Sequence, residues 1–124
     1  MCLLGSDYNY LPLRVGPTLR KRFPSRMFAA VDVCDYAWLI RFHWLVTCDR
    51  GGRIYAVADI GGVVGMHRFI LLTLNPHLRD RTAPRFYADH RNGYTLDNRR
   101  RNLRVASREE NKANRWPYME LAEG

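Results

Sequence analysis

Apolar residues along this chain come in short runs that predict a mixture of strands and helices. The run at residues 27–31 predicts a strand. The runs at 44–47 and 54–57 predict a β-hairpin, because the turn-forming sequence Asp-Arg-Gly-Gly at 49–52 lies between them. A Gly-Gly pair at 61–62 predicts a second turn in the same half of the chain.

Polar residues beside apolar segments predict where two helices begin and end. Asp32 is a candidate N-cap, because its side chain could accept a hydrogen bond from the amide near Asp35. A further short strand is predicted at 63–66. The residues at 67–74 predict a helix, which Asn75 and Pro76 end because proline disfavours helical backbone in the residue before it.

The last third of the chain predicts a strand, a strand and a helix. The strands are expected at 85–88 and 103–106, with a long polar loop at 91–101 between them. Ser107 and Glu110 have the Ser-x-x-Glu spacing of a capping box, which predicts a helix from about Ser107.

The length and the predicted elements indicate one small α+β domain spanning residues 1–124. A β-rich region with short helices at 11–76 would support the C-terminal unit at 85–116. No internal repeat or low-complexity tract divides the chain.

Positive charge is concentrated in the C-terminal third. The chain has 20 Lys and Arg against 12 Asp and Glu, for a net charge of +8 and a pI near 9.9. Between Arg79 and Arg115, eleven Lys and Arg stand against five Asp and Glu, so this segment holds six of the eight net charges. Ten of the eleven are Arg, whose planar guanidinium pairs with phosphate more readily than a solvated surface requires. A polyanionic partner is therefore expected.

The cysteines and the apolar runs bear on the compartment. Cys2, Cys34 and Cys48 are odd in number and have no C-x-x-C spacing, so we expect reduced, packing cysteines rather than a disulfide framework or a structural zinc site. The apolar start at 1–5 is too short for a signal peptide, and no run approaches membrane-spanning length. We expect an intracellular protein with no membrane partner.

Four polar residues around the predicted C-terminal hairpin favour metal-assisted cutting of a phosphodiester. Such hydrolysis needs a nucleophilic water, neutralisation of charge on the phosphoryl oxygens and help for the leaving oxygen. Magnesium prefers oxygen and binds few protein ligands, so Asp89 with a carboxamide oxygen from Asn102 or Asn111 would suffice. His90, with an ordinary pKa of about 6.5, is a candidate general base. Because neighbours on a strand alternate faces, this requires the backbone to turn at His90.

These motifs resemble a known family. The stretch at 88–93, followed by 96–107 and 111–115, closely resembles the HNH endonucleases of phages and mobile introns, which share the ββα-metal fold. The likeness extends upstream and covers roughly residues 11 to 115. It implies that the unit at 85–116 is a ββα-metal unit and that the host is a bacterium or a phage-infected cell.

The resemblance implies a role for each motif residue. Asp89 and Asn111 would be the metal ligands, His90 the general base, and Asn102 the residue that ties the loop together by hydrogen bonds and so orients the base. Asn111 stands where many relatives have histidine, which favours Mg²⁺, with Mn²⁺ as a substitute, over Zn²⁺. The family also has a histidine at the position of His67, although a core or helix-start role is the favoured interpretation of this residue, with support of the site as the alternative. Asn114, three residues after Asn111, would at most support the site from outside the ligand set.

The implied partner is double-stranded DNA, and the implied reaction leaves 5′-phosphate and 3′-hydroxyl ends by nicking or by double-strand cutting. We expect a monomer or homodimer with no small-molecule cofactor. Phosphate contact is assigned to five arginines, one of which could instead pair with Asp97: Arg99, Arg100, Arg101, Arg104 and Arg115.

Other interpretations remain open. The main alternative is a basic DNA-binding protein that keeps the fold but cuts weakly or not at all; salt-dependent binding is expected of both, and metal-dependent cutting separates them. An RNA-associated protein is disfavoured because no exposed aromatic platform is evident.

Asn92 and Asn98 are interpreted as turn formers rather than ligands. The aromatic residues interpreted as core are Trp38, Trp44, Tyr55 and Phe69.

Overall fold

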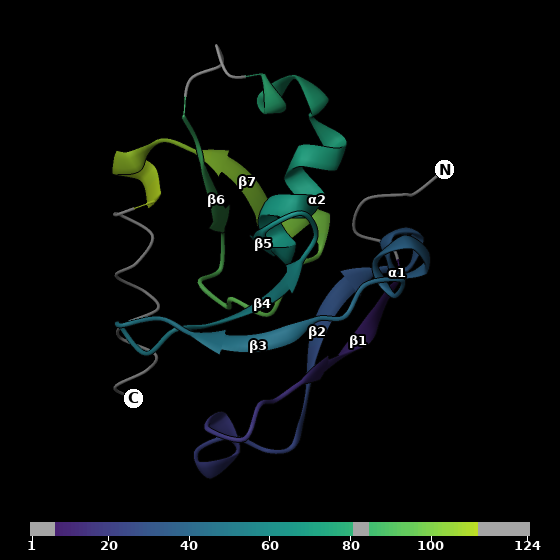
Figure 1. Cartoon of the computed structure of the whole chain (residues 1–124). Helices are drawn as coiled ribbons and strands as arrows, with labels where there is room; N and C mark the ends of the chain where they lie inside the picture. Colours follow the sequence, from purple (N-terminus) through teal and green to yellow (C-terminus); the bar gives the residue numbers. More distant parts are fainter. Residues whose placement is uncertain (1–6, 81–84, 112–124) are drawn as a thin grey trace.

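The computed structural model describes residues 7–80 and 85–111 and has a mixed α+β architecture (Figure 1). A five-stranded sheet has the order β2-β1-β3-β4-β5, and β6 and β7 form a separate two-stranded sheet. The expected α+β class is confirmed.

The strands and helices of the described residues alternate along the chain. In order, they are β1 (Tyr8–Arg14), β2 (Arg26–Asp32), α1 (Val33–Leu39), β3 (Leu45–Cys48), β4 (Ile54–Asp59), β5 (Val63–Gly65), α2 (Met66–Leu74), β6 (Tyr87–His90) and β7 (Leu103–Ala106). Short 3-10 turns occupy Leu19–Lys21 (η1), Pro76–Arg79 (η2) and Arg100–Asn102 (η3). The last described residues, 108–111, are helical.

Most predicted elements are present, but β1 was not predicted. This strand pairs along its whole length with β2 in antiparallel register. Its pairing with β3 is confined to Arg14 opposite Leu45, where the Arg14 amide donates to Trp44 O at 2.9 Å. Residues two apart on a strand direct their backbone nitrogens to the same side, so the nitrogen of Pro12, like that of Arg14, faces β3 and not β2. The pairing with β3 begins only at Arg14. Proline therefore costs this strand no hydrogen bond to β2.

One face of the large sheet forms the core with the helices. Leu11 and Leu13 of β1 and Ala29 and Val31 of β2 are buried on this face, while their neighbours in sequence point outward. Trp44 is buried, and Trp38 and Phe69 pack against the core cluster, as expected.

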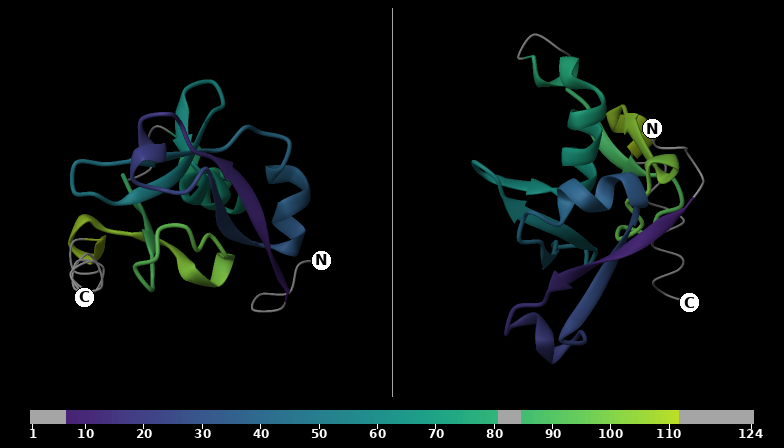
Figure 2. Two further views of the ribbon diagram at one scale, coloured as in Figure 1. Left: turned by 90° about the horizontal axis from the view of Figure 1, so that it is seen from below. Right: turned by 90° about the vertical axis from the view of Figure 1, so that its right-hand side faces the viewer.

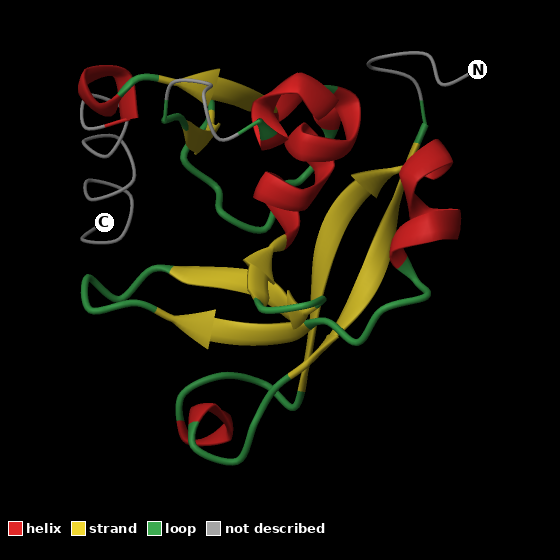
Figure 3. Cartoon of the chain, turned by 45° about the horizontal axis from the view of Figure 1, so that its top comes forward, coloured by secondary structure: helices red, strands yellow, loops and turns green. Residues whose placement is uncertain are grey.

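Helix α2 lies between the large sheet and the β6–β7 hairpin (Figure 3). The side view at the right of Figure 2 shows α2 running alongside β6. Arg68 fixes this contact, because its guanidinium lies 4.2 Å from the Phe86 ring centroid and Nη1 donates to Phe86 O at 3.2 Å. Burial of Met66, Ile70 and Leu71 on α2 thus positions the hairpin over the sheet.

The loop between β6 and β7 is bonded to the edge of β2. Ala30 N donates to Leu96 O at 2.9 Å, and Asn98 N donates to Ala30 O at 2.8 Å. These bonds continue the sheet past β2, so the loop that follows His90 is held by the N-terminal half of the chain.

An ion pair with a fully buried carboxylate completes the attachment of this loop. Arg100 makes a bidentate contact with Asp35, at 2.9 Å from Nε to Oδ2 and 2.6 Å from Nη2 to Oδ1. Asp32 is the N-cap residue of α1 as expected, but the expected side-chain cap bond is wrong. Its carboxylate accepts from Arg100 N at 2.8 Å instead, because a buried carboxylate is best satisfied by the loop amide beside it.

Two further observations concern the compartment. Cys48 is free, whereas Cys34 is disulfide-bonded, so the expectation of reduced cysteines is wrong for Cys34. Within residues 7–80 and 85–111, no helix is long and apolar enough to cross a bilayer.

Breaking the Arg100–Asp35 pair should destabilise the fold strongly. Arg100→Met leaves the fully buried Asp35 carboxylate without its guanidinium, so we expect a loss of about 3–5 kcal/mol in the free energy of unfolding measured with urea. Arg53→Met, which breaks an ion pair with the one-third-exposed Asp49, should cost no more than about 1 kcal/mol. Equal losses in the two variants would contradict this account of the loop.

Candidate active site

The β6–β7 hairpin places Asp89 and His90 on opposite faces. Asp89 stands opposite Arg104 and His90 opposite Leu103, and both the carboxylate and the imidazole are buried. The backbone turns at the end of β6, where Gly93 N donates to His90 O at 2.9 Å, but His90 itself still pairs with Leu103, so this turn does not bring its side chain to the face of Asp89. Strand alternation therefore sends the two side chains to different neighbours.

The imidazole of His90 lies in a group of three rings. Its centroid is 4.7 Å from that of His67 and 6.2 Å from that of Tyr55, and the Tyr55 and His67 rings stack at 5.4 Å. His67 stands at the start of α2, where Gly65 makes room for it: a Cβ on Gly65 would lie 2.5 Å from His67 Cε1. Tyr55, expected in the core, thus belongs to the site.

Asn98 holds His90 from the other side. His90 Nε2 lies 2.7 Å from Asn98 Oδ1, and Asn98 is buried with its backbone amide bonded to Ala30 O. A carboxamide oxygen only accepts, so Nε2 carries the hydrogen and Nδ1 is the basic nitrogen of the ring. Sequence reasoning missed this residue.

Asn98 does not serve as a turn former in the expected way. In residues 7–80 and 85–111 every positive φ angle belongs to glycine, including Gly93 at 78° in this same loop. A left-handed conformation is therefore supplied by Gly93 and not by Asn98. The signal that could have identified Asn98 is its position in the motif, between the charged Asp97 and Arg99. If such an amide is buried, it needs a specific hydrogen-bond partner.

Asn102 ties the loop together. Its Oδ1 accepts from Asn92 N at 3.0 Å, its Nδ2 donates to Asp97 O at 2.8 Å, and its own carbonyl accepts from Arg91 N at 2.7 Å. These are loop bonds of the kind that the resemblance implies. The direct contact with His90 comes from Asn98, so Asn102 acts on the base only through the loop.

Asp89 is paired with an arginine. Arg104 Nε lies 2.8 Å from Asp89 Oδ2, and Arg104 Nη1 lies 3.6 Å from Glu110 Oε2. The capping box predicted for the C-terminal helix is confirmed: Glu110 N donates to Ser107 Oγ at 3.2 Å, and Ser107 N donates to Glu110 Oε1 at 2.9 Å. This box fixes the first helical turn, which carries Asn111.

Asn111 lies on a cleft beside the three rings. The cleft has a volume of about 360 Å³, and its lining includes Asn111, His67, Tyr55 and Arg68. The structure thus brings Asn111 and His67 to one hollow. Asp89 is directed from the opposite face of β6 toward Arg104.

The oxygen atoms of Asp89 and Asn111 are donors of the kind that a hard cation takes. The described segments hold no cluster of three or more His, Cys, Asp or Glu that could bind a metal ion. Magnesium needs only one or two protein oxygens beside water and phosphate, and Asp89 and Asn111 supply that chemistry.

Three of the five arginines assigned to DNA have internal partners. Arg99 pairs with Asp97 through two contacts of 2.8 Å, as the sequence allowed for one arginine, and Arg100 and Arg104 pair with Asp35 and Asp89. Arg101 is exposed on a second hollow of about 470 Å³, which Arg91, Asn92, Arg99 and Asn102 also line. The phosphate contacts assigned to these arginines stay a prediction. Asn114 and Arg115 lie outside the described residues.

Burial keeps both histidines neutral. Desolvation, helped by His90 and Arg68, lowers the pKa of His67 to about 3. Desolvation also lowers the pKa of His90 below its ordinary value, against the opposing effects of Asn98 and Asp89. At neutral pH, His90 is therefore an unprotonated base.

Comparison with family models, with curated proteins and with solved structures finds no match to this chain. The roles of the site residues therefore rest on their geometry and on the sequence resemblance.

The buried His67 should make the fold sensitive to mild acid. Its folded pKa is depressed, so the unfolded state binds more protons below about pH 6.5 and stability falls as pH falls toward the folded pKa of about 3. Between about pH 7 and about pH 5 this group should remove about 2 kcal/mol from the free energy of unfolding. His67→Phe keeps a ring but cannot titrate, so its pH dependence should be smaller by that amount.

Urea unfolding at several pH values measures this difference. His77→Ala removes an exposed histidine and should retain the wild-type pH dependence. Parallel pH curves for wild type and His67→Phe would show that His67 is not held neutral by the fold.

Proposed function

We propose that this protein is a metal-dependent DNA endonuclease of the HNH type, hydrolysing phosphodiester bonds with His90 as general base. The order β6, β7 and the helix that begins beside Ser107 supports a ββα unit. The observation that carries the proposal is the buried, neutral His90, which Asn98 holds against the rings of His67 and Tyr55. These two rings line the cleft on which Asn111 lies.

His90 is suited to taking a proton from water. Its Nε2 is fixed on Asn98, so the ring keeps one orientation and the proton would be accepted at Nδ1. Burial lowers its pKa, so most of the population is ready to act as a base at neutral pH. The rings of His67 and Tyr55 pack against the imidazole, with centroids 4.7 and 6.2 Å away, and limit its motion.

Asp89 and Asn111 are the proposed metal ligands, with Mg²⁺ the favoured ion and Mn²⁺ a substitute. When bound, such an ion neutralises charge on the phosphate and on the leaving oxygen. Arg104 contacts Asp89 Oδ2 at 2.8 Å, and a metal ion would share this carboxylate with the guanidinium.

The arginine-rich loop supports binding to DNA. Arg91 and Arg101 line one hollow with the amides of Asn92 and Asn102, and guanidinium and amide groups together suit a phosphate. With a net charge of +8, binding to double-stranded DNA should weaken steeply as salt is added.

A second candidate is a DNA-binding protein that keeps the fold without cutting. One observation favours it: Arg104 is the counter-ion of the buried Asp89. A protein that binds no metal would need such a counter-ion for stability.

Supercoiled plasmid nicking separates the two functions. Wild-type protein with Mg²⁺ or Mn²⁺ should nick the plasmid, and chelation by EDTA should stop it. His90→Ala should nick about 10²- to 10⁴-fold more slowly because it lacks the general base, while plasmid binding is retained. The control His77→Ala replaces an exposed histidine and should nick normally. Binding without nicking by the wild type, with every metal tried, would favour the second candidate.

Asn98 should set the pH at which the nuclease loses activity. Asn98→Asp puts a carboxylate at the His90 Nε2 hydrogen bond, which favours the imidazolium and raises the pKa of His90. The acid limb of the nicking rate should therefore move to higher pH by about one unit or more. Asn9→Asp adds the same charge on β1 and should leave the limb in place. An unmoved limb in Asn98→Asp would show that His90 is not the titrating base.

A further inference from the structure

The outer face of β1 and β2 exposes aromatic rings. Tyr8, Tyr10 and Phe28 have exposed fractions of 47%, 56% and 49%. They alternate with buried residues on the same strands, and Phe28 stands opposite Pro12, next to Tyr10 on this face. This side of the sheet is therefore aromatic and faces solvent, whereas the other side forms the core.

The loop between β6 and β7 adds a fourth ring. Because Leu96 and Asn98 are hydrogen-bonded to the edge of β2 at Ala30, Tyr94 is brought beside the strands, and it is 56% exposed. The four rings, which we call the aromatic platform, are Tyr8, Tyr10, Phe28 and Tyr94. They line a hollow of about 310 Å³ together with Ala30, Leu96, Asp97 and Arg99.

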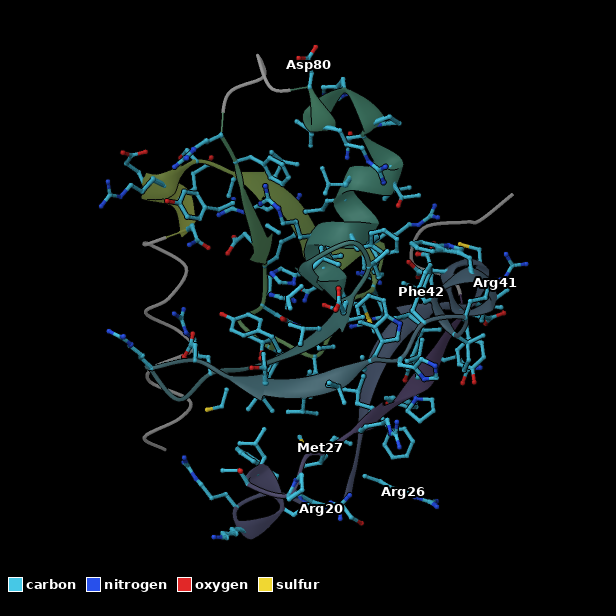
Figure 4. The ribbon with its side chains drawn as sticks, viewed as in Figure 1. Arg20, Arg26, Met27, Arg41, Phe42 and Asp80 are labelled. Carbon is cyan, nitrogen blue, oxygen red and sulfur yellow. The ribbon has the colours of Figure 1, made fainter. Side chains whose placement is uncertain are left out.

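Arginines lie at both ends of the platform. The guanidinium of Arg99 lies 5.1 Å from the Tyr8 ring centroid, and its two contacts neutralise the neighbouring Asp97 carboxylate. At the other end, Arg14 and Arg26 stand opposite each other on the same outer face. Figure 4 shows Arg26 at the start of β2, directed away from the body of the molecule and away from Met27.

This combination favours nucleic acid over an apolar protein partner. Only Ala30 and Leu96 contribute aliphatic side chains to the hollow, and three of the four rings carry a hydroxyl group. Rings on an exposed sheet, bordered by arginines, match a surface on which bases stack while the phosphates lie against cations. Stacking requires unpaired bases, because a duplex buries the faces of its bases.

We propose that the aromatic platform binds an unpaired stretch of DNA, with bases stacked on Tyr10, Phe28 and Tyr94 and with phosphates near Arg14, Arg26 and Arg99. This activity is separate from the proposed nuclease chemistry and needs neither the metal nor His90. It also corrects the expectation that the chain lacks an exposed aromatic platform.

The platform shares its loop with the candidate active site. Asn98, which holds His90, lies between Asp97 on the β2 edge and Arg99 over Tyr8. An unpaired strand on the platform would thus rest on the segment that positions His90. Such a surface would suit a nuclease whose substrate has an unpaired stretch near the bond to be cut.

The test is fluorescence anisotropy with a labelled oligo(dT) of about ten nucleotides, in EDTA, using the His90→Ala background so that nothing is cut. The double variant Tyr10→Ala/Tyr94→Ala should bind oligo(dT) about tenfold or more weakly, because it lacks two of the rings on which bases would stack. Tyr10→Phe with Tyr94→Phe keeps the rings and should bind as tightly as the parent. Binding of a blunt duplex of equal length should be the same in all three proteins.

Several results would overturn the proposal. One is equal binding of oligo(dT) by the alanine and phenylalanine pairs. Another is an equal loss of oligo(dT) and duplex binding in the alanine pair. A third is a dimer in sedimentation that the alanine pair converts to monomer with oligo(dT) binding unchanged, which would make the platform a contact between two copies. Because both tyrosines are exposed, the alanine pair should melt as the parent does. If it does not, Tyr94→Ala alone provides the comparison.

Nicking of plasmid by the alanine pair in the His90 wild-type background separates this inference from the proposed function. Retained nicking with lost oligo(dT) binding supports both, and retained nicking with retained oligo(dT) binding overturns the platform alone.

Discussion

The ion pair between Arg100 and the buried carboxylate of Asp35 is the constraint on which the rest of the site depends. It joins residues 65 positions apart and is reinforced by the bond from Arg100 N to Asp32. Without it, the loop after His90 would have to be held by a few backbone bonds to Ala30 alone. With it, the N-terminal sheet and the C-terminal hairpin form one unit, and Asn98 is fixed within hydrogen-bond distance of His90.

This arrangement explains why basic residues of one short segment do different work. Arg99, Arg100 and Arg104 lie close together in sequence, yet each pairs with a different aspartate. These pairs fix the loop, attach it to α1 and balance the buried Asp89. Arg91 and Arg101 are left to face solvent beside the loop amides, where they can meet phosphate. Net charge alone therefore overstates how many arginines are available to a polyanion.

Local signals were sufficient for much of the fold. The Ser107–Glu110 capping box and the Gly-rich turn between β3 and β4 act over a few residues, so the sequence specifies them directly. Strand β1 was missed because Pro12 is normally a strand breaker, and only its pairing with β2 explains the tolerance. Asp32 was assigned to its own helix because a partner 68 positions away leaves no local trace.

The same limit applies to the site. His90 and Asn102 were recognised from motif spacing, whereas the contact of Asn98 with His90 depends on how the loop returns to β2. The aromatic platform draws on three segments that meet only through sheet register and the Ala30 bridge. Tyr55 was assigned to the core because its neighbours are apolar, but strand alternation directs its ring to His67.

The most direct test of this account is the protonation and tautomer of His90, read from the nitrogen chemical shifts of its ring by NMR across a pH titration. The account predicts a neutral ring at neutral pH, with hydrogen on Nε2, a basic Nδ1 and a pKa below its ordinary value. A ring that carries its hydrogen on Nδ1, or that titrates at or above about pH 6.5, would contradict it.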